Sequence, residues 1–210
     1  MMAGSNNKAF VLAAFGATGS GKSHAIKKLL KRLKPNKLII WDTKLEYGNF
    51  GQVVTTFSDL INACKTSTGK KKANYKIIMQ PVEKHRDNPE AFNMVCKLAF
   101  KMTGCTYVAD ELQRVTTASS APHWWKICVA DGRHEGMTLI GAGQRPANVN
   151  KDILSNATFI RGFRLNHSGD IQTMKDFFDI TKAEYKSLSE FQYWESDCIN
   201  GKSSIKKEKK

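Results

Sequence analysis

Short runs of apolar residues alternate with amphipathic segments along most of this chain. Residues 9–15 are almost entirely apolar and predict a short buried strand, which glycines follow at once. The next segment carries apolar residues at the spacing of one helical face: Ile26, Leu29, Leu30 and Leu33. Further buried strands are predicted at residues 37–41, 75–79, 105–109, 137–142 and 158–163, with helical patterns between most of them. This alternation is typical of an α/β protein with a mainly parallel central sheet flanked by helices.

Polar and capping residues set the expected limits of other elements. Ser58 is a candidate cap for a short helix that ends at Cys64. Residues 66–74 are polar, basic and glycine-containing, and we expect them to form a loop. Asp87, followed by Glu90 three residues later, predicts the start of another helix.

Length and composition indicate one domain. The chain has 210 residues, of which 41% are hydrophobic, and this is enough to build a sizeable core. We expect residues 1–200 to form a single domain, in which residues 191–195 are an edge strand. Residues 201–210 read as a basic, disordered tail.

Composition also excludes some classes of protein. No apolar run approaches the roughly 20 residues of a membrane span, and the start of the chain lacks a secretory signal. We therefore expect a cytoplasmic protein without a transmembrane segment. The five cysteines are odd in number and include no C-x-x-C pair, so reduced thiols are expected. The five histidines lie far apart, and no zinc site is predicted.

Positive charge is concentrated in three segments. The formal net charge is +14, and residues 22–37, 65–76 and 201–210 together hold the whole excess. Local basicity of this kind favours a polyanion partner such as nucleic acid. Each segment alone also has a simpler explanation, such as complementing a helix dipole or solubilising a chain end. One run, Lys70 to Lys72, either contacts DNA phosphates or belongs to a solvated loop.

Residues 16–23 complete the phosphate-binding pattern G-x-x-x-x-G-K-[ST] between a predicted strand and a predicted helix. The candidate nucleotide ligands are Gly16, Ala17, Thr18, Gly19, Ser20, Gly21, Lys22 and Ser23. Glycines let backbone N–H groups face phosphate oxygens, and the start of the helix adds partial positive charge. Lys22 can reach the β- and γ-phosphates, and the Ser23 hydroxyl can bind Mg²⁺. The sequence therefore predicts binding of ATP with magnesium.

Two adjacent acids, Asp110 and Glu111, follow the apolar strand predicted at residues 105–109. At the carboxyl end of such a strand Asp110 can bind the magnesium shell. Glu111 points to a different side and can orient or deprotonate a water molecule. Taken alone, the pair is equally compatible with a solvated turn. After a phosphate-binding loop it favours nucleotide hydrolysis over phosphoryl transfer to a small acceptor.

Four further polar residues follow or precede predicted strands. Gln144 comes after the strand at residues 137–142, where it could touch the γ-phosphate and sense its loss. Arg133 lies at an upstream turn, and an arginine that reaches a neighbour's nucleotide can raise the rate about 10³-fold or more. Ordinary surface polarity is the alternative for both. Asp42 and Glu46 either face the nucleotide or cap a turn.

Four ordered segments resemble the FtsK–HerA superfamily of hexameric DNA-pumping ATPases: residues 16–23, 40–47, 108–111, and 132–136 leading to 143–146. The resemblance covers roughly residues 9–163, and the Gln-Arg-Pro after a strand is its most specific part. It implies an α/β P-loop NTPase fold of the ASCE, or RecA-like, type. It also implies that Gln144 is the sensor and that Arg133 is a finger acting on the next subunit, with Arg145 as a competing finger.

One residue departs from the superfamily pattern. Gly143 stands where the superfamily usually has Thr or Ser, so the local polar contacts are expected to differ.

Length selects a function within this resemblance. A chain of 210 residues has room for the motor alone, and bare motors of this kind resemble the genome-packaging ATPases of tectivirus- and corticovirus-type viruses. The resemblance implies a homo-oligomeric ring, a hexamer, that hydrolyses ATP to move double-stranded DNA into a capsid. It places the protein in the host cytoplasm and in the virion, with capsid or membrane vertex proteins as partners. The alternatives are a P-loop small-molecule kinase and a nucleotide-gated structural protein of a virion or secretion complex.

Overall fold

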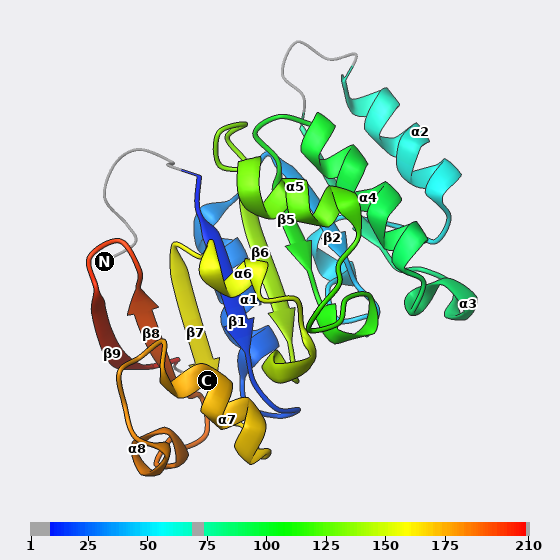
Figure 1. Ribbon diagram of the computed structural model, residues 1–210. Coiled ribbons are helices and arrows are strands. Elements are labelled where there is room, and N and C mark those ends of the chain that lie inside the picture. The colour runs from blue at the N-terminus through cyan, green and yellow to red at the C-terminus, as the bar shows by residue number, and fades with distance from the viewer. Residues whose placement is uncertain (1–8, 69–73, 209–210) are drawn as a thin grey trace.

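One sheet organises the part of the chain that the computed structural model describes, residues 9–68 and 74–208 (Figure 1). Its strands are β1 (Val11–Phe15), β2 (Lys37–Trp41), β3 (Gln52–Val54), β4 (Tyr75–Met79), β5 (Thr106–Ala109), β6 (Thr138–Gly143), β7 (Phe159–Phe163), β8 (Gln192–Asp197) and β9 (Lys202–Lys207). The strand order is β3-β4-β2-β5-β6-β1-β7-β8-β9. All pairs are parallel except β7–β8 and β8–β9. The predicted fold class, α/β with a mainly parallel sheet flanked by helices, is confirmed.

Helices cover both faces of the sheet. They are α1 (Lys22–Leu33), α2 (Phe57–Thr68), α3 (Glu83–Arg86), α4 (Pro89–Lys101), α5 (His123–Asp131), α6 (Asp152–Ser155), α7 (Ser168–Lys175) and α8 (Lys182–Lys186). In Figure 1, α1 lies behind the sheet, whereas α2, α4, α5 and α7 lie in front of it. Every residue of β1 is buried: Val11, Ala13 and Phe15 join the cluster on the front face, and Leu12 and Ala14 join α1 behind. Burial on both faces explains why the strand reads as a continuous apolar run.

The region after β3 differs from expectation. β3 itself was not predicted, and α2 continues to residue 68 instead of ending at Cys64. Thr56, and not Ser58, supplies the capping hydroxyl, which accepts a hydrogen bond from the backbone N–H of Asp59 at 3.1 Å. Residues 66–68, which were expected to begin a loop, therefore belong to α2. Lys70, Lys71 and Lys72 lie outside the described residues.

The start of α4 is also shifted by one residue from its predicted cap. Asn88 is the N-cap, and its side chain accepts hydrogen bonds from the backbone N–H groups of Glu90 and Ala91. Asp87 instead forms an ion pair with Arg114 at 2.7 Å. The sequence indicated a helix start here, but two adjacent acceptors compete for that role and pattern alone does not separate them.

The C-terminal expectations are wrong in two respects. Residues 202–207 form β9 and are not a disordered tail, and β8 is an inner strand and not an edge, because β9 pairs with it along its length. The residue after β9, Glu208, is held by two contacts. It accepts a hydrogen bond from the Tyr193 hydroxyl at 3.2 Å and pairs with Lys28 of α1 at 3.3 Å. Lysines along β9 gave the segment the composition of a solvated tail, although its backbone completes the sheet.

Within residues 9–68 and 74–208, no helix combines the length and the apolar composition that crossing a bilayer requires.

Candidate nucleotide-binding site

The carboxyl ends of four parallel strands meet at one edge of the sheet. In the strand order, β6 lies between β1 and β5, and β2 lies on the other side of β5. The segments that follow these strands carry the phosphate-binding loop, Gln144, the Asp110–Glu111 pair and the turn after Trp41. Ligands of open α/β sheets bind at such an edge, outside the carboxyl ends of the strands. The topology therefore brings together segments that lie far apart in the sequence.

The phosphate-binding loop leads from β1 directly into α1. Gly21 is the N-cap of α1 with a φ of 93°, and Gly19 has a φ of 74°. Both angles are left-handed, a conformation that glycine adopts without steric cost. The loop therefore delivers Lys22 and Ser23 to the first turn of α1, where unpaired backbone N–H groups favour an anion.

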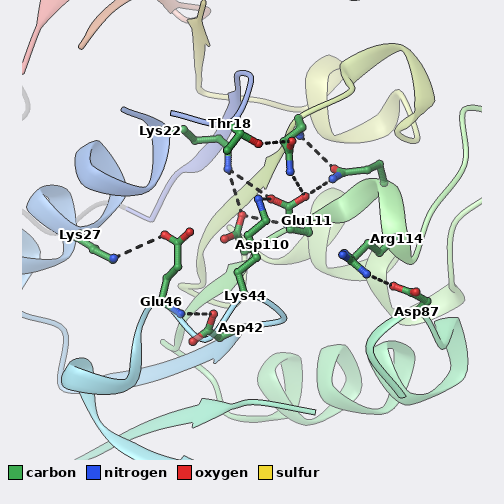
Figure 2. A network of polar contacts seen from close by, with 12 residues as sticks. Thr18, Lys22, Lys27, Asp42, Lys44, Glu46, Asp87, Asp110, Glu111 and Arg114 are labelled. Carbon is green, nitrogen blue, oxygen red and sulfur yellow. Dashed lines mark hydrogen bonds and ion pairs between the residues drawn. The ribbon is translucent and has the colours of Figure 1, made fainter. Parts of the chain in front are cut away.

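Lys22 points back to the two acids (Figure 2). Its Nζ atom lies 3.5 Å from Asp110 Oδ1 and 3.9 Å from Glu111 Oε1. All three side chains are buried, with exposures of 5%, 0% and 1%. Burial raises the pKa of the Asp110 carboxyl above its usual value, and the nearby Lys22 charge offsets this only in part. Among the described residues, Asp110 Oδ2 has no hydrogen-bond partner, so one buried oxygen is left for a ligand.

Glu111 is held in an unusual backbone conformation by several donors. Its φ is 58°, a left-handed value that is uncommon outside glycine. Gln144 Nε2 donates to Glu111 Oε2 at 2.8 Å, and Gln113 Nε2 donates to the same oxygen. Burial acts to raise the pKa of the Glu111 carboxyl. The charges of Lys22 and Lys44 and these hydrogen bonds outweigh it, however, and hold the pKa below its usual range.

Gln144 bridges the phosphate-binding loop and the acidic pair. Its Oε1 accepts a hydrogen bond from the Thr18 hydroxyl at 2.8 Å, while its Nε2 donates to Glu111. The side chain sits in this position because β6 lies between β1 and β5. A change at the phosphate-binding loop can therefore reach Glu111 through one side chain.

Gln113 is a site residue that the sequence reasoning missed. Besides contacting Glu111, its Oε1 accepts a hydrogen bond from the backbone N–H of Gln144 at 3.2 Å. A Cβ atom added at Gly143 would lie 2.5 Å from this Oε1. The glycine that departs from the superfamily pattern thus makes room for Gln113. The only signal in the sequence was its position two residues after Glu111, on a short turn that periodicity does not describe.

Lys44 is the second missed residue. Its Nζ lies 2.6 Å from Glu111 Oε1, the shortest ion-pair contact to that carboxylate. The turn that carries it is fastened by Asp42, which accepts hydrogen bonds from the backbone N–H groups of Glu46 and Tyr47 at 3.0 and 2.9 Å. Asp42 therefore caps the turn, which resolves one of the alternatives left open by the sequence. Glu46 pairs with Lys27 of α1 at 3.6 Å.

The two candidate finger arginines lie at opposite ends of β6, Arg133 before its amino end and Arg145 after its carboxyl end. Arg133 is exposed in the turn between α5 and β6, where a hydrogen bond from Gly104 N to Glu135 O ties the turn to the start of β5. It is therefore separated from its own site by the length of β6, on the order of 20 Å for six residues. Arg145 lies near the site, but it is paired with the buried Asp170 at 2.7 Å.

Sequence comparison matches part of the chain to a known family. The family model of the central domain of helicase HerA matches residues 11–93, which contain the phosphate-binding loop and the turn that carries Lys44. In this segment the chain resembles that domain. The chain is also similar to Protein P9 of Pseudoalteromonas phage PM2. The two are 27% identical over 194 residues, which cover 87% of this chain and 83% of P9.

Solved structures share the fold of this chain over nearly its whole length. The genome packaging NTPase B204 from Sulfolobus turreted icosahedral virus 2, in complex with ATP-gammaS, superposes with a TM-score of 0.77 at 19% identity. The match covers 98% of this chain and 100% of B204. VirB4 of Thermoanaerobacter pseudethanolicus gives a TM-score of 0.68 at 12% identity, covering 99% of this chain and 92% of VirB4. At these identities the likeness is one of fold.

Proposed function

We propose that this protein is an ATP-hydrolysing motor that packages double-stranded DNA into a viral capsid. The observation that carries the proposal is the Gln144 bridge between Thr18 of the phosphate-binding loop and Glu111. Such a bridge lets the γ-phosphate control the group that activates water. The similarity of this chain to the genome packaging NTPase B204 and to Protein P9 of phage PM2 supports the same proposal.

Each site residue has a defined part in the proposed hydrolysis. Backbone N–H groups of residues 16–23 and the ammonium of Lys22 hold the β- and γ-phosphates. A water molecule attacks the γ-phosphorus, the bond to the β–γ bridging oxygen breaks, and ADP leaves. Glu111 takes the proton that the water gives up. Gln144 responds to the loss of the γ-phosphate.

The residues present fit a magnesium ion. Asp110 Oδ2 is buried without a hydrogen-bond partner among the described residues, and Ser23 lies in the first turn of α1. Hydroxyl and carboxylate oxygens are ligands that Mg²⁺ accepts directly or through its waters. When bound, the ion would neutralise charge on the phosphate oxygens.

A ring is part of the proposal. Arg133 is too far from its own nucleotide site to act there, but in a hexameric ring it would reach the site of the next subunit. Arg145 is already engaged with Asp170, which makes it the weaker candidate. We further propose that the ring works in the host cytoplasm against capsid or membrane vertex proteins, and that basic segments of the chain contact the DNA phosphates.

The test of this function is ATP hydrolysis with and without duplex DNA. We expect DNA to raise the rate of phosphate release, without phosphorylation of any small acceptor, and Glu111→Gln to abolish turnover while nucleotide binding persists. Glu83→Gln, at an exposed position of α3, is the matched control and should hydrolyse ATP like the wild type. A phosphorylated acceptor would instead support a kinase. Turnover in Glu111→Gln equal to the wild-type rate would overturn the assigned base.

A further inference from the structure

Two ammonium groups converge on a single oxygen of Glu111 (Figure 2). Lys44 Nζ lies 2.6 Å and Lys22 Nζ 3.9 Å from Glu111 Oε1. Lys22 is the lysine of the phosphate-binding loop, which contacts the β- and γ-phosphates when a nucleotide binds. A γ-phosphate held by Lys22 therefore comes within reach of the flexible side chain of Lys44.

The turn around Lys44 holds it in this position at a local energetic cost. Leu45, the next residue, has a φ of 59°, and its side chain is 53% exposed. A left-handed leucine persists only where its surroundings impose it. Asp42 does so by accepting hydrogen bonds from two backbone N–H groups and from Gln80 Nε2, the last at 2.9 Å. The backbone that presents Lys44 is thus fixed, while its side chain, 27% exposed, has room to move.

The present contact of Lys44 is unfavourable for hydrolysis itself. A carboxylate that activates water needs a lone pair directed at that water. Glu111 Oε2 already accepts hydrogen bonds from Gln113 and Gln144. Oε1 has no hydrogen-bond partner among the described residues, but the Lys44 ammonium lies directly against it. Binding of ATP brings additional negative charge next to Lys22. An ammonium beside both a single carboxylate and a γ-phosphate is drawn to the phosphate, which carries more charge.

We propose that Lys44 is a second cation for the γ-phosphate, exchanging Glu111 for that phosphate when ATP binds. In the nucleotide-free protein it neutralises Glu111. In the ATP complex it binds the γ-phosphate, and Glu111 Oε1 becomes available to water. ADP lacks the γ-phosphate, so Lys44 returns to Glu111 once the cleaved phosphate has left the site. This inference rests on the proposed ATPase function and names a further residue of the same site.

Lys44→Met tests the exchange, because methionine keeps most of the side-chain length and removes the charge. The measurement is the affinity for AMPPCP and for ADP, each with Mg²⁺, by calorimetry without DNA. We expect Lys44→Met to weaken the binding of AMPPCP about tenfold, as for loss of one charge-assisted hydrogen bond. The binding of ADP should weaken less than about twofold. Lys44→Arg should keep most of the preference for AMPPCP. Lys27→Met is the matched control: its ammonium pairs with Glu46 and not with the acids, so both affinities should be unchanged.

Two results would overturn the exchange. Equal weakening of AMPPCP and ADP would show a general effect on the site, and unchanged affinities would show that Lys44 does not contact the γ-phosphate. A melting curve identifies a variant that does not fold, and Lys44→Gln then takes its place in the same measurement. The readout is independent of DNA. A protein without DNA-stimulated turnover that still shows the selective loss would refute the proposed motor and leave the exchange intact.

Discussion

At the scale of single residues, the site depends on Gly143, which departs from the superfamily pattern, and on Gln113, which belongs to no motif. Gly143 leaves the space into which Gln113 reaches, and Gln113 in turn contacts both Glu111 and the backbone of Gln144. Glu111 keeps its left-handed backbone within this set of contacts. Removing one member should therefore loosen the position of Glu111, the proposed base, more than it disturbs the binding of nucleotide.

Gly143→Ala is predicted to lower kcat about tenfold with little change in the KM for ATP, because the new methyl group displaces Gln113 from Glu111. Steady-state ATPase kinetics provide the measurement. Gly169→Ala is the control, since a Cβ at that position meets no atom within 4 Å.

The same substitution in a Gln113→Ala background separates two explanations. If displacement of Gln113 is the cause, the double variant should be no slower than Gln113→Ala alone. A further tenfold loss in the double variant would contradict this, and would locate the effect in the contact with Phe15 on the other side of Gly143.

At the scale of elements, β9 determines how the sheet ends. β8 and β9 pair in register from Gln192↔Lys207 to Asp197↔Lys202, so β9 and not β8 presents the open edge. Every residue of β9 is exposed, and three of the six are lysines. Charged side chains on an exposed edge oppose pairing with other chains. The lysines that suggested a disordered tail therefore have a role on an ordered strand.

Truncation after Gly201 is predicted to lower the melting temperature by about 2–4 °C, the shift that roughly 1 kcal/mol produces in a domain of this size. The truncated protein loses the β8–β9 ladder and the Glu208 contacts with Tyr193 and Lys28. Calorimetry gives the shift, and light scattering should show more aggregation because β8 becomes an open edge. An unchanged melting temperature would mean that β9 adds nothing to stability.

At the scale of the whole molecule, the two ends of the parallel strands carry different parts of the proposed chemistry. The phosphate-binding loop, the acids and Gln144 lie at the carboxyl ends, while the turn with Arg133 lies at the amino ends. A single subunit therefore cannot bring Arg133 to its own nucleotide. Two subunits packed with the amino ends of one set of strands against the carboxyl ends of the other could bring Arg133 to the neighbour's nucleotide. This arrangement predicts that two inactive variants restore activity to each other when mixed.

If Arg133 acts as the proposed arginine finger, Arg133→Ala is predicted to bind ATP normally and to lose turnover by about 10³-fold. Mixed with Glu111→Gln, it should regain part of the activity, because some interfaces then combine an intact arginine with an intact base. Lys126→Ala, an exposed position on α5, controls for surface changes and should retain wild-type turnover. The absence of rescue at every mixing ratio, in assemblies shown to be mixed, would count against action between subunits.

Local sequence determined much of this protein. The apolar runs predicted the parallel strands other than β3, and the pattern from Gly16 to Ser23 predicted the loop that joins β1 to α1, since both depend on neighbouring residues. Asp110 and Glu111 were likewise recognisable, because they directly follow a buried strand. In each case the physical requirement is met within a few residues of the chain.

Only the tertiary structure decided which side chains meet. Lys44 and Gln144 contact Glu111 because β2, β5 and β6 are neighbours in the sheet, and the periodicity of a single strand does not determine strand order. The sequence pattern likewise did not predict β9, because its lysines are exposed and the strand is held in place by backbone pairing with β8. Hydrogen bonds and ion pairs between distant segments depend on how the sheet is assembled, and assembly is a property of the whole chain.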